Sequence, residues 1–264
     1  MTADARRNRR IRMNIWTLKL SRRWLRVALA IIGLYCILPW VAPTLMHFGL
    51  DEPAHVIYFL YGPFCHQFAF RSFFLFGEQP DYPRAISGTT QIPYETAVAN
   101  SPQFKQAISK YIGGPGSSFQ TVDQFDPYVW SFELQFGSKD FFGDPQMGYK
   151  LAICERDIAI YSAILIGGLI YSIPIVRKRL RPVPLWLYII LGVMPIAIDG
   201  FSQLFGYPPF NFWAPRETLP IFRVVTGALF GLMNAWLAFP YLELSFGDTR
   251  RQLIEKLARA GIQV

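Results

Sequence analysis

Long apolar blocks separated by charged or polar segments dominate the pattern of this chain. The first block, residues 27–48, contains no Asp, Glu, Lys or Arg and is long enough to cross about 30 Å of hydrocarbon. Three further regions, residues 151–176, 182–205 and 219–243, also contain apolar runs of membrane length. The pattern predicts an all-α integral membrane protein with four transmembrane helices.

The chain between the first and second blocks has two different compositions. Residues 49–77 are apolar but interrupted at Gly62-Pro63, which predicts an interfacial or re-entrant pair of short helices. Residues 78–150 are rich in Pro, Gly, Ser, Thr and aromatic residues, and we expect a small, loop-rich extracytoplasmic insertion there. Within it, residues 101–112 are expected to be helical, and strict alternation over 128–136 predicts a half-buried strand.

Basic residues give the chain a net charge of +8, and their positions predict its orientation. They concentrate in the N-terminal arm 1–26, in the short segment 177–181 and in the tail 244–264. By the positive-inside rule these segments are cytoplasmic and both termini lie inside. Anionic lipid at the cytoplasmic face explains this charge more simply than nucleic acid, which we do not expect as a partner.

In this topology, polar residues from separate segments fall at the same outer level of the bundle. Lipid cannot satisfy polar groups at that depth, so they must satisfy one another. We therefore predict a polar network at the outer helix ends, for which ion pairs between helices are the simplest explanation. Its expected members are Arg71, Arg156, Asp199, Gln203, Asn211, Arg216, Arg223 and Thr226.

Four short motifs carry a resemblance to a known family. They are Cys65-His66-Gln67 with Arg71-Ser72-Phe73, then Cys154-Glu155-Arg156-Asp157, Asp199-Gly200 with Gln203 and Gly206, and Arg223 with Thr226-Gly227. As an ordered set over residues 49–231 they resemble an uncharacterised family of prokaryotic four-helix membrane proteins, a domain of unknown function. The resemblance implies a fold and a prokaryotic inner (plasma) membrane, and it implies no activity. Asp157 stands where many members have a second Cys, which weakens a thiolate-rich metal site.

Three interpretations remain open for Cys65 and Cys154. The first is a disulfide, because both cysteines are expected on the oxidising side of the membrane. The second is a metal site that also includes His66 and Asp157, whose mixed sulfur, nitrogen and oxygen ligands suit zinc or another transition metal. The third is a pair of free, packed thiols.

The function most favoured is a non-enzymatic accessory subunit or metal-binding assembly component, held in the lipid bilayer with other membrane protein subunits. The alternative is a metal-dependent membrane enzyme at the outer leaflet. A small transporter is the third interpretation, and the apolar inner halves of the spans argue against it. The chain contains no phosphate loop, zincin or haem-attachment motif, so a standard hydrolase or nucleotide enzyme is not expected.

Overall fold

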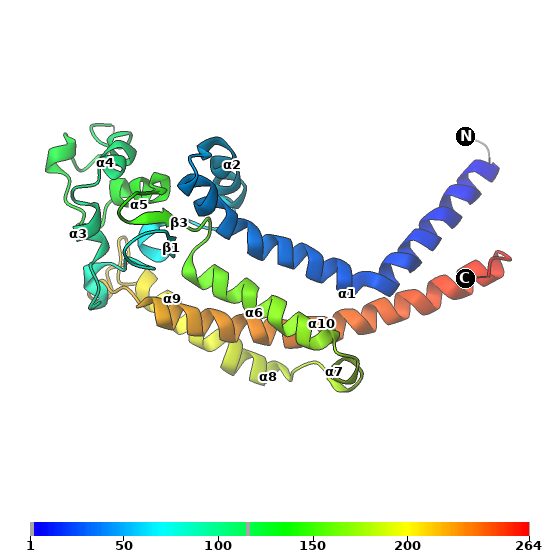
Figure 1. The fold of residues 1–264 in the computed structure, drawn as a ribbon. Coiled ribbons are helices and arrows are strands. Elements are labelled where there is room, and N and C mark those ends of the chain that lie inside the picture. Colours follow the sequence, from blue (N-terminus) through cyan, green and yellow to red (C-terminus); the bar gives the residue numbers. More distant parts are fainter. Residues whose placement is uncertain (1–2, 115–116, 264) are drawn as a thin grey trace.

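The structure is a computed structural model that describes residues 3–114 and 117–263. Long helices lie side by side, with a smaller layer at one end and both chain termini toward the other (Figure 1). The elements in chain order are α1 (Ala3–His47), α2 (Asp51–Tyr61), η1 (Ala69–Arg71), β1 (Phe74–Leu75), η2 (Ala85–Ser87), α3 (Tyr94–Val98), α4 (Pro102–Ser109), η3 (Val122–Gln124), α5 (Phe132–Asp140), β2 (Gly143–Asp144), β3 (Gly148–Lys150), α6 (Glu155–Ser172), α7 (Pro174–Arg179), α8 (Leu185–Leu187), η4 (Tyr188–Val193), α9 (Met194–Leu204) and α10 (Pro220–Arg259).

Within the described ranges, three helical segments are long and apolar enough to cross a membrane, namely Ala5–His47, Leu185–Leu204 and Pro220–Arg259. Only 11–28% of the residues in their apolar stretches are buried in the protein, as expected for helices whose outer faces contact lipid. The second predicted span corresponds to α6. Its 18 residues include Glu155, Arg156 and Asp157 in the first turn, so composition alone does not identify it as a span.

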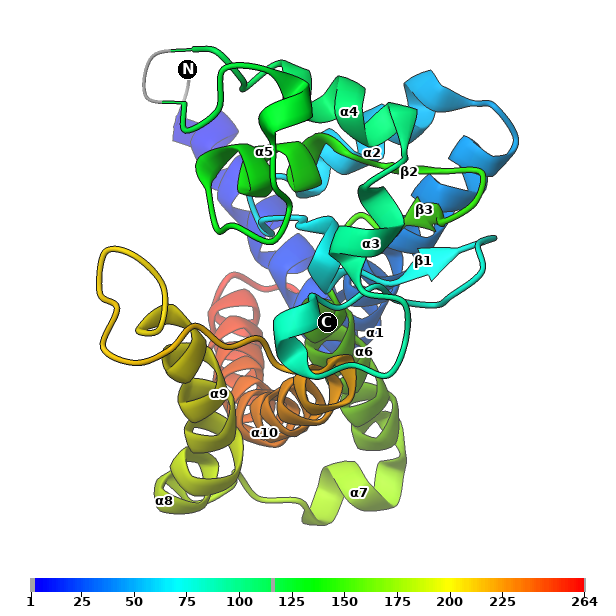
Figure 2. The same cartoon turned by 90° about the vertical axis from the view of Figure 1, so that its left-hand side faces the viewer.

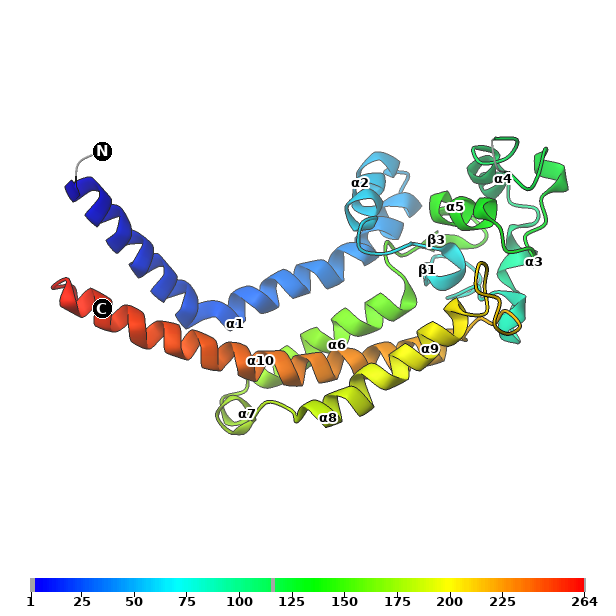
Figure 3. The same ribbon diagram turned by 180° about the vertical axis from the view of Figure 1, so that it is seen from behind.

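The helices α6 and α10 lie at the centre of the bundle, with α1 on one side and α8–α9 on the other (Figures 1 and 3). Glycines allow α6 and α10 to make the most extensive helix–helix contact. A Cβ added at Gly231 would lie 2.8 Å from the Cβ of Ala163, and one added at Gly167 would lie 2.6 Å from the Cβ of Ala235. These glycines are therefore required for the close approach of the two backbones.

The helices α1 and α10 continue past their apolar stretches toward the termini and pack together there. The residues of this contact include Leu18, Leu253 and Leu257. Glu243 of α10 accepts hydrogen bonds from side chains on three helices, and the donors are Trp24 (2.8 Å), Arg177 (2.5 Å) and Arg250 (2.8 Å). The basic arm is thus a helical extension of α1, and Glu243 joins it to α7 and α10.

Residues 62–114 and 117–150, which we call the cap, lie at the end of the bundle opposite the termini (Figures 1 and 2). The cap has its own hydrophobic core, whose buried aromatic members are Phe70, Phe74, Tyr82, Tyr94, Phe104 and Phe141. A short antiparallel sheet runs through it in the order β1-β3-β2, pairing Phe74 with Lys150 and Gly143 with Tyr149. The cap therefore adds a small sheet to a mostly helical protein.

Two local predictions for the cap have different outcomes. The helix predicted within residues 101–112 is confirmed as α4. The strand predicted at 128–136 is wrong, because residues from Phe132 onward form α5. The Ser131 hydroxyl caps this helix by accepting a hydrogen bond from the Leu134 backbone N–H at 3.2 Å. The N-terminal hydrogen bond to Ser131 and the burial of one face of α5 favour a helix over the strand that the short alternating pattern predicted.

The segment predicted as a pair of short interfacial helices contains one α-helix, α2, followed by the 3₁₀ turn η1. The chain between them has no regular structure from Cys65 to Phe68, and Gln67 adopts a positive φ of 56°. This irregular stretch carries the Cys-His-Gln motif. Its backbone is therefore held by contacts with other segments rather than by helical hydrogen bonds.

Substituting Gly231 with Val is expected to separate α6 from α10, because the new side chain would overlap the Ile160 backbone and the Ala163 side chain. Overpacking of this kind costs about 1–3 kcal/mol. The matched control is Gly247→Val on the same helix, where the nearest atom to an added Cβ is the mobile end of Arg250 at 3.7 Å. Thermal unfolding of the purified variants should show a lower midpoint for Gly231→Val only. Equal midpoints would contradict the packing argument.

Candidate functional site

A buried carboxylate, Glu217, lies where the cap meets the helix ends, in the loop between α9 and α10. Its side chain is only 1% exposed. It accepts two hydrogen bonds from the Arg71 guanidinium, at 2.5 and 3.2 Å, one from Arg223, and one from the Tyr207 hydroxyl at 3.1 Å. Burial alone would raise the pKa of Glu217, but Arg71 and Arg223 outweigh it and hold the pKa below its ordinary value.

Arg223 connects three helices from its position near the start of α10. Besides Glu217, it donates to the carboxylate of Glu155 on α6 at 3.4 Å and to the side-chain oxygen of Gln203 on α9 at 3.3 Å. Arg223 and Glu155 are almost completely buried. Removing one partner of such a pair leaves an uncompensated charge, so the network constrains the positions of all three helices.

Asp199 forms the second half of the network, between α6 and α9. Its carboxylate accepts hydrogen bonds from Arg156 and from the Thr218 hydroxyl, the latter at 2.5 Å. Gln203 donates to the same Thr218 oxygen at 2.7 Å. Arg216 lies 3.9 Å from Asp199 and is half exposed, so it is a weaker partner.

The structure brings six of the eight predicted network residues together and leaves two outside. Asn211 is exposed in the loop after α9. Thr226 donates within its own helix, to the carbonyl oxygen of Phe222 at 2.8 Å.

The network predicted from the sequence did not include Glu155 and Glu217, which are the main acidic partners of Arg223. Glu217 could have been included from the sequence, because its carboxylate lies only three residues before the membrane-length helix α10.

Cys65, Cys154 and Asp157 form a second group at the same junction. Their two sulfur atoms and a carboxylate oxygen all lie within 4.8 Å of one another. The Cys154 thiol donates to the Asp157 carboxylate at 3.1 Å, and each of the three cysteines in the described part of the chain is a free thiol. The Cys65 sulfur accepts backbone N–H groups of Gln67 at 3.4 Å and Cys154 at 3.3 Å. The group therefore brings two sulfur atoms and a carboxylate oxygen together, and these atom types are ligands suited to zinc.

His66 does not join this group, although it was predicted to do so. Its ring lies 5.4 Å from the ring of Phe68, and the side chain lines a neighbouring cavity. The chain from Cys65 to Phe68 is neither helix nor strand, so adjacency in sequence does not bring the side chains of Cys65 and His66 to one point. The structure thus assembles three of the four expected ligands.

Gln67, the third residue of the Cys-His-Gln motif, holds this irregular stretch against its neighbours. Its buried side-chain amide donates to the carbonyl oxygens of Tyr58 at 2.8 Å and Ala152 at 2.7 Å. The first bond ties the stretch to α2, and the second ties it to the segment before α6. Gln67 therefore helps to keep Cys65 beside Cys154.

Lys150, at the end of β3, is completely buried and was not singled out from the sequence. Its ammonium group donates to the carbonyl oxygens of Gln67 (2.7 Å), Ser138 (3.0 Å) and Lys139 (2.6 Å). Burial lowers the pKa of Lys150 to about 7. The ammonium form supplies the three N–H donors that three carbonyls require, and two of those carbonyls belong to the negative end of α5.

A cavity of about 680 Å³ lies between the cap and the ends of α6 and α9 that are nearest the cap. It is close to both groups, because its wall includes Arg71, Arg156 and Gln203 of the network and the motif residue His66. Aromatic side chains form much of the remaining wall. They are Phe68, Trp130, Phe132 and Tyr207. The cap therefore completes a cavity that the helix ends alone do not enclose.

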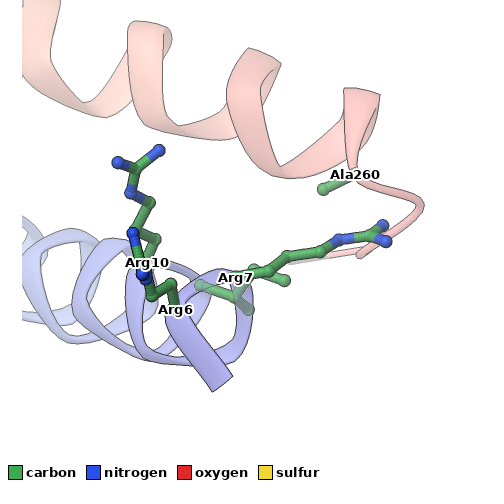
Figure 4. Close-up of a pocket in the computed structure, with 5 residues that line it drawn as sticks. Arg6, Arg7, Arg10 and Ala260 are labelled. Atoms are coloured by element: carbon green, nitrogen blue, oxygen red, sulfur yellow. The ribbon is translucent and has the colours of Figure 1, made fainter. Parts of the chain in front are cut away.

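A second pocket, of about 440 Å³, lies at the opposite end of the molecule between α1 and the end of α10 (Figure 4). Arg6, Arg7 and Arg10 line it together with Ile11 and Ala260. These arginines belong to the basic arm that was predicted to face anionic lipid. The pocket therefore lies between this arm and the C-terminal end of α10, beyond the apolar part of that helix.

Comparison with known proteins identifies the class of the region that contains most of the network. Residues 146–237 match the model of a family described as "Predicted membrane protein (DUF2085)". The chain is also 32% identical over 94 residues to "Uncharacterized protein MJ1492" of Methanocaldococcus jannaschii, an alignment that covers 35% of this chain and 54% of that protein. The chain thus spans about half the length of this relative. No solved structure matches the chain.

These matches confirm the resemblance to an uncharacterised membrane-protein domain family. The matched residues run from just before β3 through α6 and α9 into α10, and they include Cys154, Asp199 and Arg223. Cys65, Arg71 and most of the cap lie outside the family match. The resemblance predicted over residues 49–231 is therefore shown for its C-terminal part, and the protein is a membrane protein.

Replacing Glu217 with Gln should lower the free energy of unfolding by about 3–5 kcal/mol at neutral pH, because the buried guanidinium of Arg223 and the partly exposed one of Arg71 lose their carboxylate. Because the folded-state pKa is below the ordinary value of about 4.3, the stabilisation is complete above that pH and is lost as the pH falls through the folded-state pKa. Thermal unfolding between pH 7 and pH 3 should show this acid-induced loss in the wild type and a smaller loss in the variant.

Glu52→Gln, at an exposed position on α2, is the matched control and should behave as the wild type. The ion-pair account is wrong if Glu217→Gln unfolds at the wild-type temperature at pH 7.

Replacing Lys150 with Met should destabilise the cap, because three buried carbonyl oxygens lose their donor and each unpaired group costs about 1–3 kcal/mol. Limited proteolysis should cleave the cap of this variant faster than that of the wild type. Lys105→Met, at an exposed position in α4, provides the control. Unchanged cleavage rates would show that the buried ammonium is not required.

Proposed function

We propose that this protein is a multi-pass inner-membrane protein with four crossings, made by α1, α6, α8–α9 and α10. The argument for α6 is that its charged first turn faces protein: Glu155 is fully buried beside Arg223, and Arg156 pairs with Asp199. Beyond this turn α6 is apolar and packs along α10. The basic segments at the far end support an orientation with both termini in the cytoplasm and the cap outside.

We further propose that the protein binds a transition-metal ion and acts as a non-enzymatic accessory or assembly component of a larger membrane complex. The observation that carries this proposal is the meeting of Cys65, Cys154 and Asp157, whose ligand atoms lie within 4.8 Å although the two cysteines are 89 residues apart in sequence. Two thiolates and a carboxylate suit zinc and leave one position for water or for a ligand from a partner.

The backbone around Cys65 supports this assignment. Its sulfur accepts two main-chain N–H groups, from Gln67 and Cys154, which fix its position beside the second cysteine. Gln67 fixes the same backbone from the other side through Tyr58 and Ala152. A ligand held in place before the ion arrives loses less entropy on binding, so the arrangement is suited to a resident ion.

A metal-dependent enzyme at the outer leaflet is the second candidate, and the cavity beside His66 and Arg156 is the observation that favours it. The two candidates differ in their behaviour during purification. An accessory component should co-purify with other membrane subunits in mild detergent at a fixed ratio. Recovery of a metal-loaded protein without any partner would favour the enzyme.

Elemental analysis of the purified protein tests the metal site. We expect about one transition-metal ion per chain, with free thiols, and loss of most of the metal in Cys65→Ser, Cys154→Ser and Asp157→Asn, because each change removes one ligand. Cys36→Ser is the matched control, since Cys36 lies within α1 and outside the ligand group.

A thiol count under non-reducing, denaturing conditions accompanies the metal analysis. A chain without metal and with one reactive thiol out of three would mean that Cys65 and Cys154 form a disulfide. That result would contradict the metal proposal, as would full metal content in all three ligand variants.

A further inference from the structure

The wall of the cavity between the cap and the helix ends is basic. His66, Arg71 and Arg156 line it, and among the described residues that form the wall there is no Asp or Glu. The carboxylates that pair with these arginines, Glu217 and Asp199, are not part of the wall. A ligand in the cavity would therefore meet guanidinium and imidazole groups, which favours an anion.

Both arginines are held by carboxylates that do not line the cavity, and both keep further N–H donors. Glu217 engages Nε and Nη2 of Arg71, and Asp199 engages Nη2 of Arg156. In the described part of the chain, Nε of Arg156 is buried and has no hydrogen-bond acceptor. A buried N–H group without an acceptor is destabilising. Guanidinium groups held in this way match the oxygen geometry of a phosphate.

The remaining wall is apolar and aromatic. Trp130 of the cap stacks on Tyr207 with ring centroids 4.0 Å apart, and Phe68 and Phe132 extend this surface. Leu204 also lines the cavity, and it is the last residue of the membrane-length segment Leu185–Leu204. The cavity thus reaches from basic side chains to the end of a lipid-facing helix. Its ligand should combine an anionic group with an apolar part.

We propose that this cavity binds the phosphate group of an anionic membrane lipid, with Arg71 and Arg156 on the phosphate and the aromatic wall beside the adjoining apolar part. The site shares no residue with the Cys65, Cys154 and Asp157 group, so the proposal does not depend on metal binding. It also gives the cap a role, because Ser118, Trp130 and Gln135 of the cap complete the wall.

The test is thermal unfolding of the delipidated full-length protein in detergent with added phosphatidylglycerol, phosphatidylcholine or inorganic phosphate. We expect phosphatidylglycerol to raise the unfolding midpoint in a saturable manner and phosphatidylcholine to raise it much less. Arg156→Gln should weaken the apparent affinity for phosphatidylglycerol at least tenfold. Arg216→Gln is the matched control, because Arg216 also faces Asp199 but does not line the cavity.

A second variant, Gln135→Trp, fills the cavity from the cap side and leaves the ion pairs intact, because within the described residues the Gln135 side chain bonds only to the Ser131 carbonyl. It should also lose the response to phosphatidylglycerol, and it decides the question if Arg156→Gln fails to fold. Stabilisation by inorganic phosphate equal to that by the lipid would support the phosphate site but overturn the lipid as its source. Equal stabilisation by phosphatidylcholine, no stabilisation by any probe, or a full response in Gln135→Trp would overturn the proposal.

Discussion

The pairing of the buried Glu217 carboxylate with Arg71 and Arg223 is the interaction on which the junction between the cap and the helix ends depends. The side chains of Glu217 and Arg223 are almost completely buried in the protein, so neighbouring protein groups must satisfy their charges. Arg71 comes from the cap and Arg223 from α10, and the Tyr207 hydroxyl adds a third donor from the loop between α9 and α10. The cap and the bundle therefore cannot separate without leaving unpaired charges behind.

The position of the cap in turn determines the geometry of the two candidate sites. The stretch around Cys65 lies beside the start of α6 because Gln67 and Lys150 bind its backbone and that of its neighbours. The same docking closes the cavity over Arg156 with residues of the cap. A thiol group and a basic cavity thus arise from one junction between segments that are distant in sequence.

Much of the membrane part could be predicted from the sequence, because lipid imposes a simple rule on composition and length. Apolar block length identified α1, α9 and α10 as helices able to cross a membrane. The partners of the charges could not be predicted in the same way. Several acidic residues occur near the helix ends, and only the fold selects Glu155 and Glu217 as partners of Arg223.

The cap was less predictable because local signals there compete. The alternation of polar and apolar residues over 128–136 favoured a strand. The hydrogen bond from the Leu134 N–H to the Ser131 hydroxyl, together with tertiary packing, favours helix α5. The directions of the His66 and Cys65 side chains depend on an irregular backbone that no periodicity describes.

X-ray absorption at the metal edge of the loaded protein tests most directly the central claim, that Cys65, Cys154 and Asp157 bind a transition-metal ion. The account predicts two sulfur ligands at about 2.3 Å with an oxygen ligand at about 2.0–2.2 Å, and a shell without sulfur would contradict it.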